Sequence, residues 1–207
     1  MGIVTALDLN RKKDRARLYV DGSYVLTIPV ELVFEYKLKT GMDISESQLE
    51  VLIEKGEVHR CNEAAYRLLS YRARSEQELI ERLARKGFST RVVEKSIEQL
   101  KERGLINDAE FARQWAENRL RFKPQSAFLT RHELKEKGLS EEIIEEAVEN
   151  YNDYENALAA ARPKALRENK EDFLIFKRRI GNFLNRRGFN YGVIKPVINQ
   201  LWKEVTE

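Results

Sequence analysis

The sequence predicts a mainly α-helical protein, with three tandem three-helix repeats that resemble helix-turn-helix units and follow a small antiparallel β element. The segment LARKGFS at 83–89 returns as LKEKGLS at 134–140 and as LNRRGFN at 184–190, with its glycines 51 and 50 residues apart. Apolar residues also return at matching distances after each glycine. This recurrence is typical of helical repeats, and we expect the repeats to form an elongated, curved array.

Residues 1–45 are predicted to form the separate β element. Three short runs within residues 4–28 are rich in β-forming residues, and Asp21-Gly22 between the last two is a strong hairpin-turn dipeptide. We expect a three-stranded antiparallel sheet. Pro29 suits the first turn of a short helix that completes this element.

A linking helix is predicted over residues 46–61. Ser45 and Gln48 have the spacing of a capping box at its start. The helix can run unbroken into the first repeat, although Gly56 disfavours that continuity by about 1 kcal/mol.

Repeat one is predicted to occupy residues 62–106. Ser75 precedes an amphipathic run that ends at Gly87, and a second amphipathic run follows Ser89. Two such short helices cannot bury their apolar faces alone. The apolar run that ends at Arg72 therefore supplies the third helix.

Repeats two and three are predicted over residues 107–152 and 153–207. Each contains a helix with aromatic residues along one face, and these side chains are expected in the core. A platform for stacking nucleic-acid bases is the sharper alternative. The aromatic residues concerned are Phe111, Trp115, Phe122, Phe173, Phe176 and Phe183.

The repeats resemble the RecX family of bacterial regulatory proteins, which modulate the RecA recombinase. The resemblance lies in LLSYRARSEQEL (68–79), LKERGLINDAEFARQW (100–115) and the three glycine turns. It implies a regulator of DNA repair, recombination and the SOS response that binds the RecA nucleoprotein filament. Inhibition of ATP hydrolysis and strand exchange is implied with it. Ser126 departs from the family pattern, which often has glycine there, and Pro163 interrupts a stretch that should be helical.

Composition fits a cytoplasmic protein. The chain has 207 residues, and its 37 Lys and Arg against 34 Asp and Glu give a net charge of +3, too small to indicate nucleic-acid binding. A single cysteine, Cys61, excludes an internal disulfide framework and fits a reducing compartment. No run approaches the roughly 20 apolar residues of a membrane span. We expect a monomer.

No catalytic, metal or cofactor motif is present. The sequence lacks GxxxxGK[ST], GxGxxG and HExxH. His59 and Cys61 are two residues apart, which places them on different faces of a helix, and His132 is distant. We therefore expect no enzymatic activity and no cofactor.

Basic residues beside the glycine turns and before Pro124 are the predicted binding surface. Equivalent positions of a helical array lie along one face, so these residues can form a basic stripe that meets an acidic recombinase surface or DNA phosphates. Arg72 has the alternative of pairing within its own repeat. The predicted stripe comprises Arg72, Arg74, Lys86, Arg119, Arg121, Lys123, Arg131, Arg186 and Arg187.

Two other functions fit the same repeats. A three-helix unit with a tight turn resembles a helix-turn-helix DNA-binding protein, but its third helix in repeat two reads EEIIEEAVENY, which would repel DNA. A non-catalytic helical scaffold is the third possibility, and periodicity alone does not exclude it.

Overall fold

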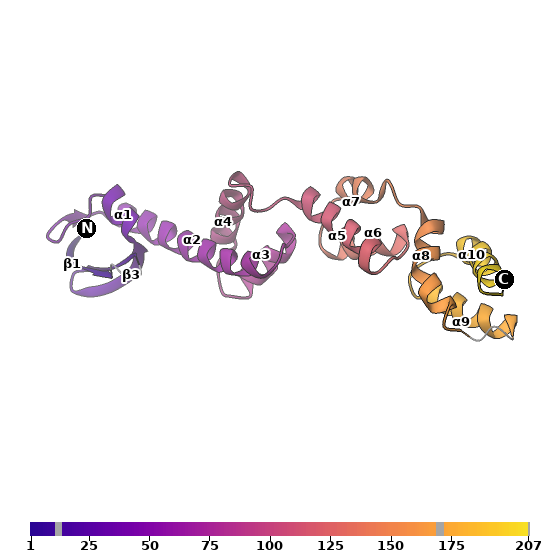
Figure 1. Ribbon diagram of the computed structural model, residues 1–207. Helices are drawn as coiled ribbons and strands as arrows, with labels where there is room; N and C mark the ends of the chain where they lie inside the picture. Colours follow the sequence, from indigo (N-terminus) through magenta and orange to yellow (C-terminus); the bar gives the residue numbers. More distant parts are fainter. Residues whose placement is uncertain (11–13, 169–171, 207) are drawn as a thin grey trace. The chain divides into compact units, whose positions relative to one another are not determined.

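The computed structural model describes residues 1–10, 14–168 and 172–206. These residues form a four-stranded sheet and ten helices; the first helix lies between the third and fourth strands, and the other nine follow the sheet (Figure 1). The predicted mainly α-helical class with a small N-terminal β element is confirmed. The chain divides into two compact units, Met1–Ile106 and Asn107–Glu207.

The sheet is antiparallel, with strand order β3-β2-β1-β4. Asp21 and Gly22 both have positive φ, 51° and 78°, which the predicted two-residue turn requires. The prediction of three strands is wrong in number, because a fourth strand pairs with Gly2 and Ile3. Its two residues are too few to show a strand pattern in sequence. The strands are β1 (Gly2–Asn10), β2 (Arg15–Val20), β3 (Ser23–Pro29) and β4 (Asp43–Ile44).

Helix α2 (Glu46–Tyr71) joins the sheet to the first repeat without a break. The predicted capping box of Ser45 and Gln48 is present at its start. Gly56 faces the sheet: a Cβ there would lie 2.9 Å from Leu26 Cδ1 and 3.2 Å from Ile28 Cγ2. A larger side chain at this position would push the sheet away from the helix, which explains why a glycine stands inside α2. Helix α1 (Val30–Glu35) precedes it.

Repeat one consists of the C-terminal half of α2, α3 (Glu76–Ala84) and α4 (Thr90–Glu102). Leu79, Leu83 and Leu100 are fully buried and pack with residues of α2 from Val58 onward. This cluster contains no residue of the sheet.

Truncation of residues 1–45 is expected to leave a folded helical chain, because none of the three repeat cores includes a residue from that segment. Leu52, now fully buried against the sheet, would become exposed at a cost of about 1.5–3 kcal/mol, local to the start of α2. Circular dichroism should show a cooperative thermal transition and undiminished helix content per residue. Loss of the helical signal would show that the sheet is required by the repeats.

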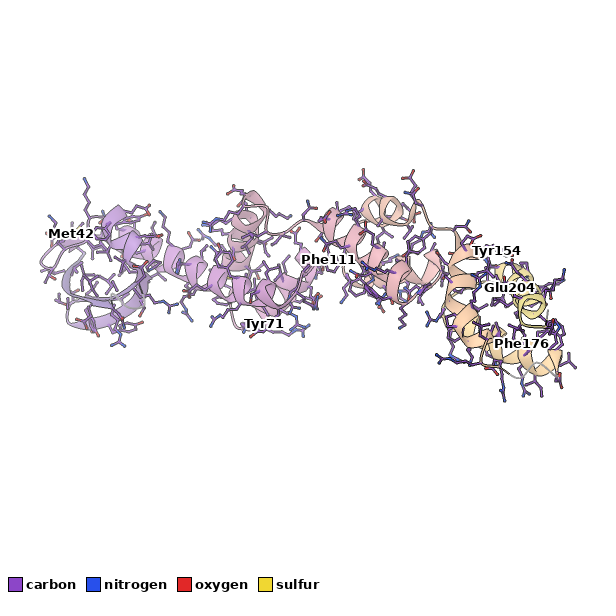
Figure 2. The ribbon with its side chains drawn as sticks, viewed as in Figure 1. Met42, Tyr71, Phe111, Tyr154, Phe176 and Glu204 are labelled. Carbon is purple, nitrogen blue, oxygen red and sulfur yellow. The ribbon has the colours of Figure 1, made fainter. Side chains whose placement is uncertain are left out.

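Repeats two and three follow the same order of three helices. Phe176 lies at the centre of repeat three (Figure 2) and contacts Trp202, with ring centroids 5.1 Å apart. Pro163 lies inside the first helix of repeat three and does not end it. The helices are α5 (Asp108–Phe122), α6 (Ala127–Glu136), α7 (Glu141–Val148), α8 (Asp153–Ala165), α9 (Phe173–Asn185) and α10 (Tyr191–Thr206).

The aromatic residues divide between core and surface. Phe111 and Phe176 are buried as predicted, but Phe122 is 71% exposed. The prediction of a core position is wrong for Phe122, because it is the last residue of α5 and the chain turns away there. Tyr71, the last residue of α2, is 83% exposed (Figure 2).

The turn of repeat three packs against repeat two. The backbone N–H of Ser126 donates to the carbonyl of Arg187 at 3.0 Å, and Arg187 Nη1 donates to the carbonyl of Pro124 at 2.7 Å. Gly188 follows Arg187 at this contact and has φ +82°. A Cβ at Gly188 would be 2.5 Å from Ser126 Oγ. Gly87 has a similar φ of +88°, but nothing lies within 4 Å of a Cβ at that position. Gly138, in the turn of repeat two, has φ +78°, so all three turn glycines adopt positive φ, and Gly188 also contacts repeat two.

Candidate interaction surface

Arg74 holds the turn between α2 and α3 together. It is only 8% exposed, its Nε donates to the carbonyl of Leu68 at 3.0 Å, and its Nη1 donates to Glu78 Oε1 at 2.6 Å. The prediction that Arg74 lies on a partner-facing surface is therefore wrong. Arg72 is half exposed, but its guanidinium also bonds Glu78 and the carbonyl of Ala73. It thus takes the alternative of pairing within its own repeat.

Arg119 belongs to a polar network inside repeat two. Its Nε donates to Glu133 Oε2 at 2.7 Å, and its guanidinium lies over the Trp115 ring at 4.6 Å. Trp115 Nε1 and Gln125 Nε2 donate to the same carboxylate oxygen at 2.9 and 3.0 Å. Arg119 therefore ties α5 to α6, and reversing its charge would disturb the repeat itself.

The network lowers the pKa of Glu133. Desolvation by burial raises that pKa, but the hydrogen bonds from Arg119, Trp115 and Gln125 outweigh it, so the pKa lies below the ordinary value of 4.5. A carboxyl whose pKa is lowered by folding stabilises the protein above its unfolded pKa. That contribution is lost as the pH falls through the lower, folded pKa.

Glu133→Gln is expected to reduce the free energy of unfolding at pH 7 by about 1–3 kcal/mol, because it weakens three hydrogen bonds to a partly buried group. Thermal unfolding of both proteins should show this difference shrinking as the pH is lowered from 7 to below 4. Glu136→Gln, at an exposed position on the same helix, is the matched control and should have almost no effect. An unchanged difference at low pH would show that Glu133 acts through packing and not through charge.

Arg131 and Arg187 are also committed to contacts within the protein. Arg131 Nε and Nη2 donate to the two oxygens of Glu145 at 2.7 and 2.9 Å, joining α6 to α7. Arg187 lies over the Phe183 ring at 4.6 Å, and burial lowers the pKa of its guanidinium. Both side chains therefore have structural roles.

Four residues of the predicted stripe are exposed and make no ion pair with any carboxylate in the described part of the chain. They lie beside the first glycine turn, at the end of α5, and beside the third glycine turn. Charge reversal at these positions should leave the fold intact, because none of the substitutions breaks an ion pair within the protein. These exposed cations are Lys86, Arg121, Lys123 and Arg186.

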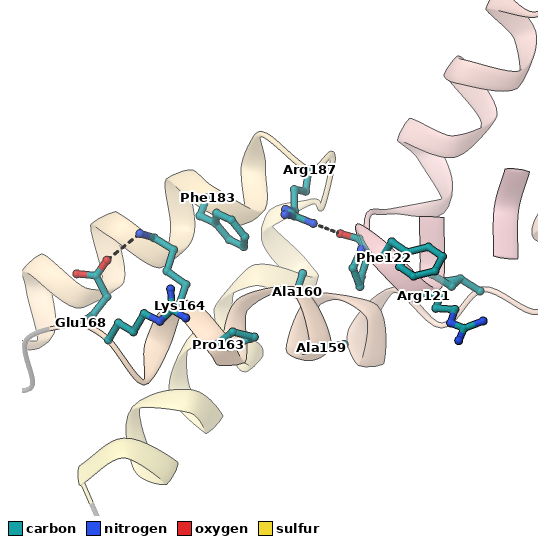
Figure 3. A pocket seen from close by; sticks show the side chains of 12 residues that line it. Arg121, Phe122, Ala159, Ala160, Pro163, Lys164, Glu168, Phe183 and Arg187 are labelled. Atoms are coloured by element: carbon teal, nitrogen blue, oxygen red, sulfur yellow. Dashed lines mark hydrogen bonds and ion pairs between the residues drawn. The ribbon is translucent and has the colours of Figure 1, made fainter. Parts of the chain in front are cut away.

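A cleft in the second unit collects cations that include two of the predicted stripe, Arg121 and Arg187 (Figure 3). Its volume is about 600 Å³, and it lies between the end of α5, α8 and α9. Arg121 lies over the exposed Phe122 ring at 5.1 Å, on one rim of the cleft. Lys164 lies on another wall, where it pairs with Glu168 at 2.9 Å (Figure 3).

The sequence did not indicate three residues of this cleft. Lys164 and Arg167 were not among the predicted site residues, and Phe183 was expected in the core and not as a partner of cations. Lys164 lies on α8, Arg167 just after its end and Phe183 on α9, whereas the predicted stripe included no residue between Arg131 and Arg186. The one available signal was the spacing of Lys164 and Arg167, three residues apart at the end of α8, which places two cations on one side of the chain there. The packing of α8 beside the end of α5 cannot be read from a repeat pattern.

No group of His, Cys, Asp and Glu in the described ranges has the arrangement of a metal site. None of the helices there is long and apolar enough to cross a lipid bilayer.

Family models match each of the three repeats. The first, second and third three-helix domains of RecX match residues 61–100, 107–148 and 151–198. Among curated proteins, the chain is 30% identical over 205 residues to the regulatory protein RecX of Clostridioides difficile strain 630, covering 97% of this chain and 96% of that one. It is 29% identical over 206 residues to the regulatory protein RecX of Clostridium botulinum strain Alaska E43, with the same coverage.

Two solved structures have the same fold. A crystal structure of a regulatory protein RecX superposes with a TM-score of 0.73 at 20% identity, covering 96% of this chain and all of that one. RecX from Lactobacillus salivarius superposes with a TM-score of 0.61 at 24% identity, covering 70% of this chain and 96% of that one.

Proposed function

The chain belongs to the RecX family, and on that premise we propose that it binds the RecA nucleoprotein filament and inhibits its ATP hydrolysis and strand exchange. The observation that best supports this proposal is the set of exposed cations Lys86, Arg121, Lys123 and Arg186, which pair with no carboxylate in the described structure. Exposed charges contribute little to stability, so the place of these cations beside two glycine turns and at the end of α5 suits recognition better than folding.

Binding by a repeat protein to a repeating filament can accumulate strength. Each repeat offers a turn, and contacts with successive filament subunits add as avidity without any single contact being strong. A protein that bridges several filament subunits restrains them. This restraint would inhibit ATP hydrolysis by RecA without any catalytic activity of the bridging protein. We therefore propose a non-catalytic regulator, acting in the cytoplasm where the filament forms.

The structure disfavours reading of the DNA major groove by the third helices of repeats one and two. In α7 the residues Glu141, Glu142 and Glu146 are exposed. In α4 the basic residues Arg91 and Lys95 are both paired with Glu54, at 2.5 and 2.6 Å. Neither helix presents the free cationic or amide groups that base recognition uses.

The proposal is tested by titrating the purified chain into RecA filaments on single-stranded DNA and measuring ATP hydrolysis. We expect inhibition that saturates near one chain per few RecA subunits and weakens as salt screens the cations. The chain alone should hydrolyse no ATP. Unchanged RecA turnover at saturating chain would refute the proposal.

A further inference from the structure

The cleft of the second unit differs from other hollows of similar size in its charge. Four cations and one carboxylate line it. The hollow between α6 and α7 has two of each, the hollow between α1, α2 and α4 has three of each, and the hollow between β2, β3 and α2 has two cations and one carboxylate. An uncompensated cluster of cations favours an anionic ligand. The charged residues of the cleft are Arg121, Lys164, Arg167, Glu168 and Arg187.

Two of the four cations, Arg187 and Lys164, are held in place before any ligand arrives. Arg187 and Lys164 lie over the Phe183 ring, at 4.6 and 6.0 Å from its centroid. The single carboxylate, Glu168, also accepts from Arg179 at 2.7 Å, so its charge is shared with a residue that does not line the cleft. Arg167 makes no ion pair among the described residues and is exposed. Little reorganisation of Arg187 and Lys164 is therefore needed for binding, whereas Arg167 is free to turn toward a ligand.

The apolar part of the cleft suits a side chain better than a nucleobase. Its floor is formed by Ala159, Ala160 and Pro163, which are small and present no aromatic face (Figure 3). The two aromatic residues of the cleft, Phe122 and Phe183, both have cations over their rings, so a base that stacked there would compete with those cations. An apolar side chain on this floor would leave flanking carboxylates within reach of the cations.

From this geometry we infer that the cleft binds an acidic peptide segment of a protein partner, with one apolar or aromatic side chain on the alanine floor and carboxylates at the cationic walls. The inference rests on the proposed function, because a RecA filament is the partner that would supply the segment. It adds the location of the contact and the chemistry of the segment.

The direct test uses three labelled probes and fluorescence anisotropy. They are a peptide of six glutamates around one phenylalanine, a peptide of glutamates alone, and an oligothymidylate of equal charge. The full chain should bind the phenylalanine peptide at least several-fold more tightly than the other two. Tighter binding of the oligothymidylate would overturn the inference and make the cleft a nucleic-acid site.

Charge reversal locates the binding. Arg121→Glu with Arg167→Glu should weaken binding of the phenylalanine peptide by about tenfold or more, because two attractive contacts become repulsive. The matched control is Lys177→Glu with Arg178→Glu, at exposed positions of α9 that do not line the cleft. It has the same change in net charge and should alter affinity less than twofold. Equal losses in both variants would overturn the inference.

A neutral variant tests the floor. Ala159 is exposed within the cleft, so Ala159→Phe fills the space without removing a charge or a core contact. The preference for the phenylalanine peptide over the glutamate peptide should disappear, while affinity for the glutamate peptide is retained. A preserved preference would place the apolar side chain elsewhere and overturn the inference.

The two proposals fail separately. Inhibition of RecA by a chain that binds no probe peptide would overturn the cleft inference and leave the proposed function standing. Peptide binding by a chain that leaves RecA turnover unchanged would do the reverse.

Discussion

Reversing three exposed cations, Lys86→Glu, Lys123→Glu and Arg186→Glu together, is expected to raise the concentration needed for half-inhibition of RecA ATP hydrolysis by more than tenfold. Each substitution replaces an attraction with a repulsion at the proposed interface, and the losses accumulate across the filament. None of the three lines the peptide cleft or pairs with a carboxylate in the described structure. The thermal midpoint should therefore stay nearly unchanged.

A second triple variant controls for net charge. Lys37→Glu, Lys39→Glu and Lys195→Glu change the charge by the same amount at exposed positions outside the predicted stripe. This variant should inhibit like the unsubstituted chain. Equal loss of inhibition in both variants would show that net charge, and not this set of residues, governs the effect.

Gly188→Ala is expected to give the largest loss of stability, about 2–5 kcal/mol. A residue with a side chain at φ +82° costs about 1–2 kcal/mol, and the new Cβ would lie 2.5 Å from Ser126 Oγ and 2.8 Å from Leu129 Cβ. Crowding of this kind typically costs a further 1–3 kcal/mol. Chemical denaturation of the two proteins measures the difference.

Gly87→Ala separates the two causes. Its φ of +88° imposes the same backbone strain, but a Cβ there would have no neighbour within 4 Å. We expect a loss of about 1–2 kcal/mol from strain alone. Equal losses at the two glycines would mean that repeat three does not pack tightly against repeat two at this turn.

The repeated pattern predicted the fold because the same physical requirement recurs three times. Each copy needs a residue at positive φ after its second helix and apolar residues on matching faces, and both requirements are visible in sequence. Strand β4 escaped prediction because two residues form no pattern. Gly56 lowered the expected continuity of α2, since its close approach to Leu26 depends on the tertiary structure.

The site was predicted only in part, because sequence shows where charges are but not what they contact. Arg74 and Arg119 look like surface cations in sequence, yet each bonds a carboxylate and helps to hold its repeat together. Their partners Glu78 and Glu133 are 4 and 14 residues away, and the chain offers many carboxylates at such distances. The cleft brings α5 beside α8 and α9, a contact between repeats that no single repeat contains.

Co-sedimentation tests the central claim most directly. The chain is mixed with RecA filaments on single-stranded DNA, or with the same DNA alone, and the bound fraction is measured across a salt series. We predict that the chain sediments with the filament at salt concentrations where it no longer sediments with naked DNA, and that the Lys86, Lys123 and Arg186 variant stays in the supernatant. Equal binding to filament and naked DNA would contradict the account and identify the chain as a DNA-binding protein.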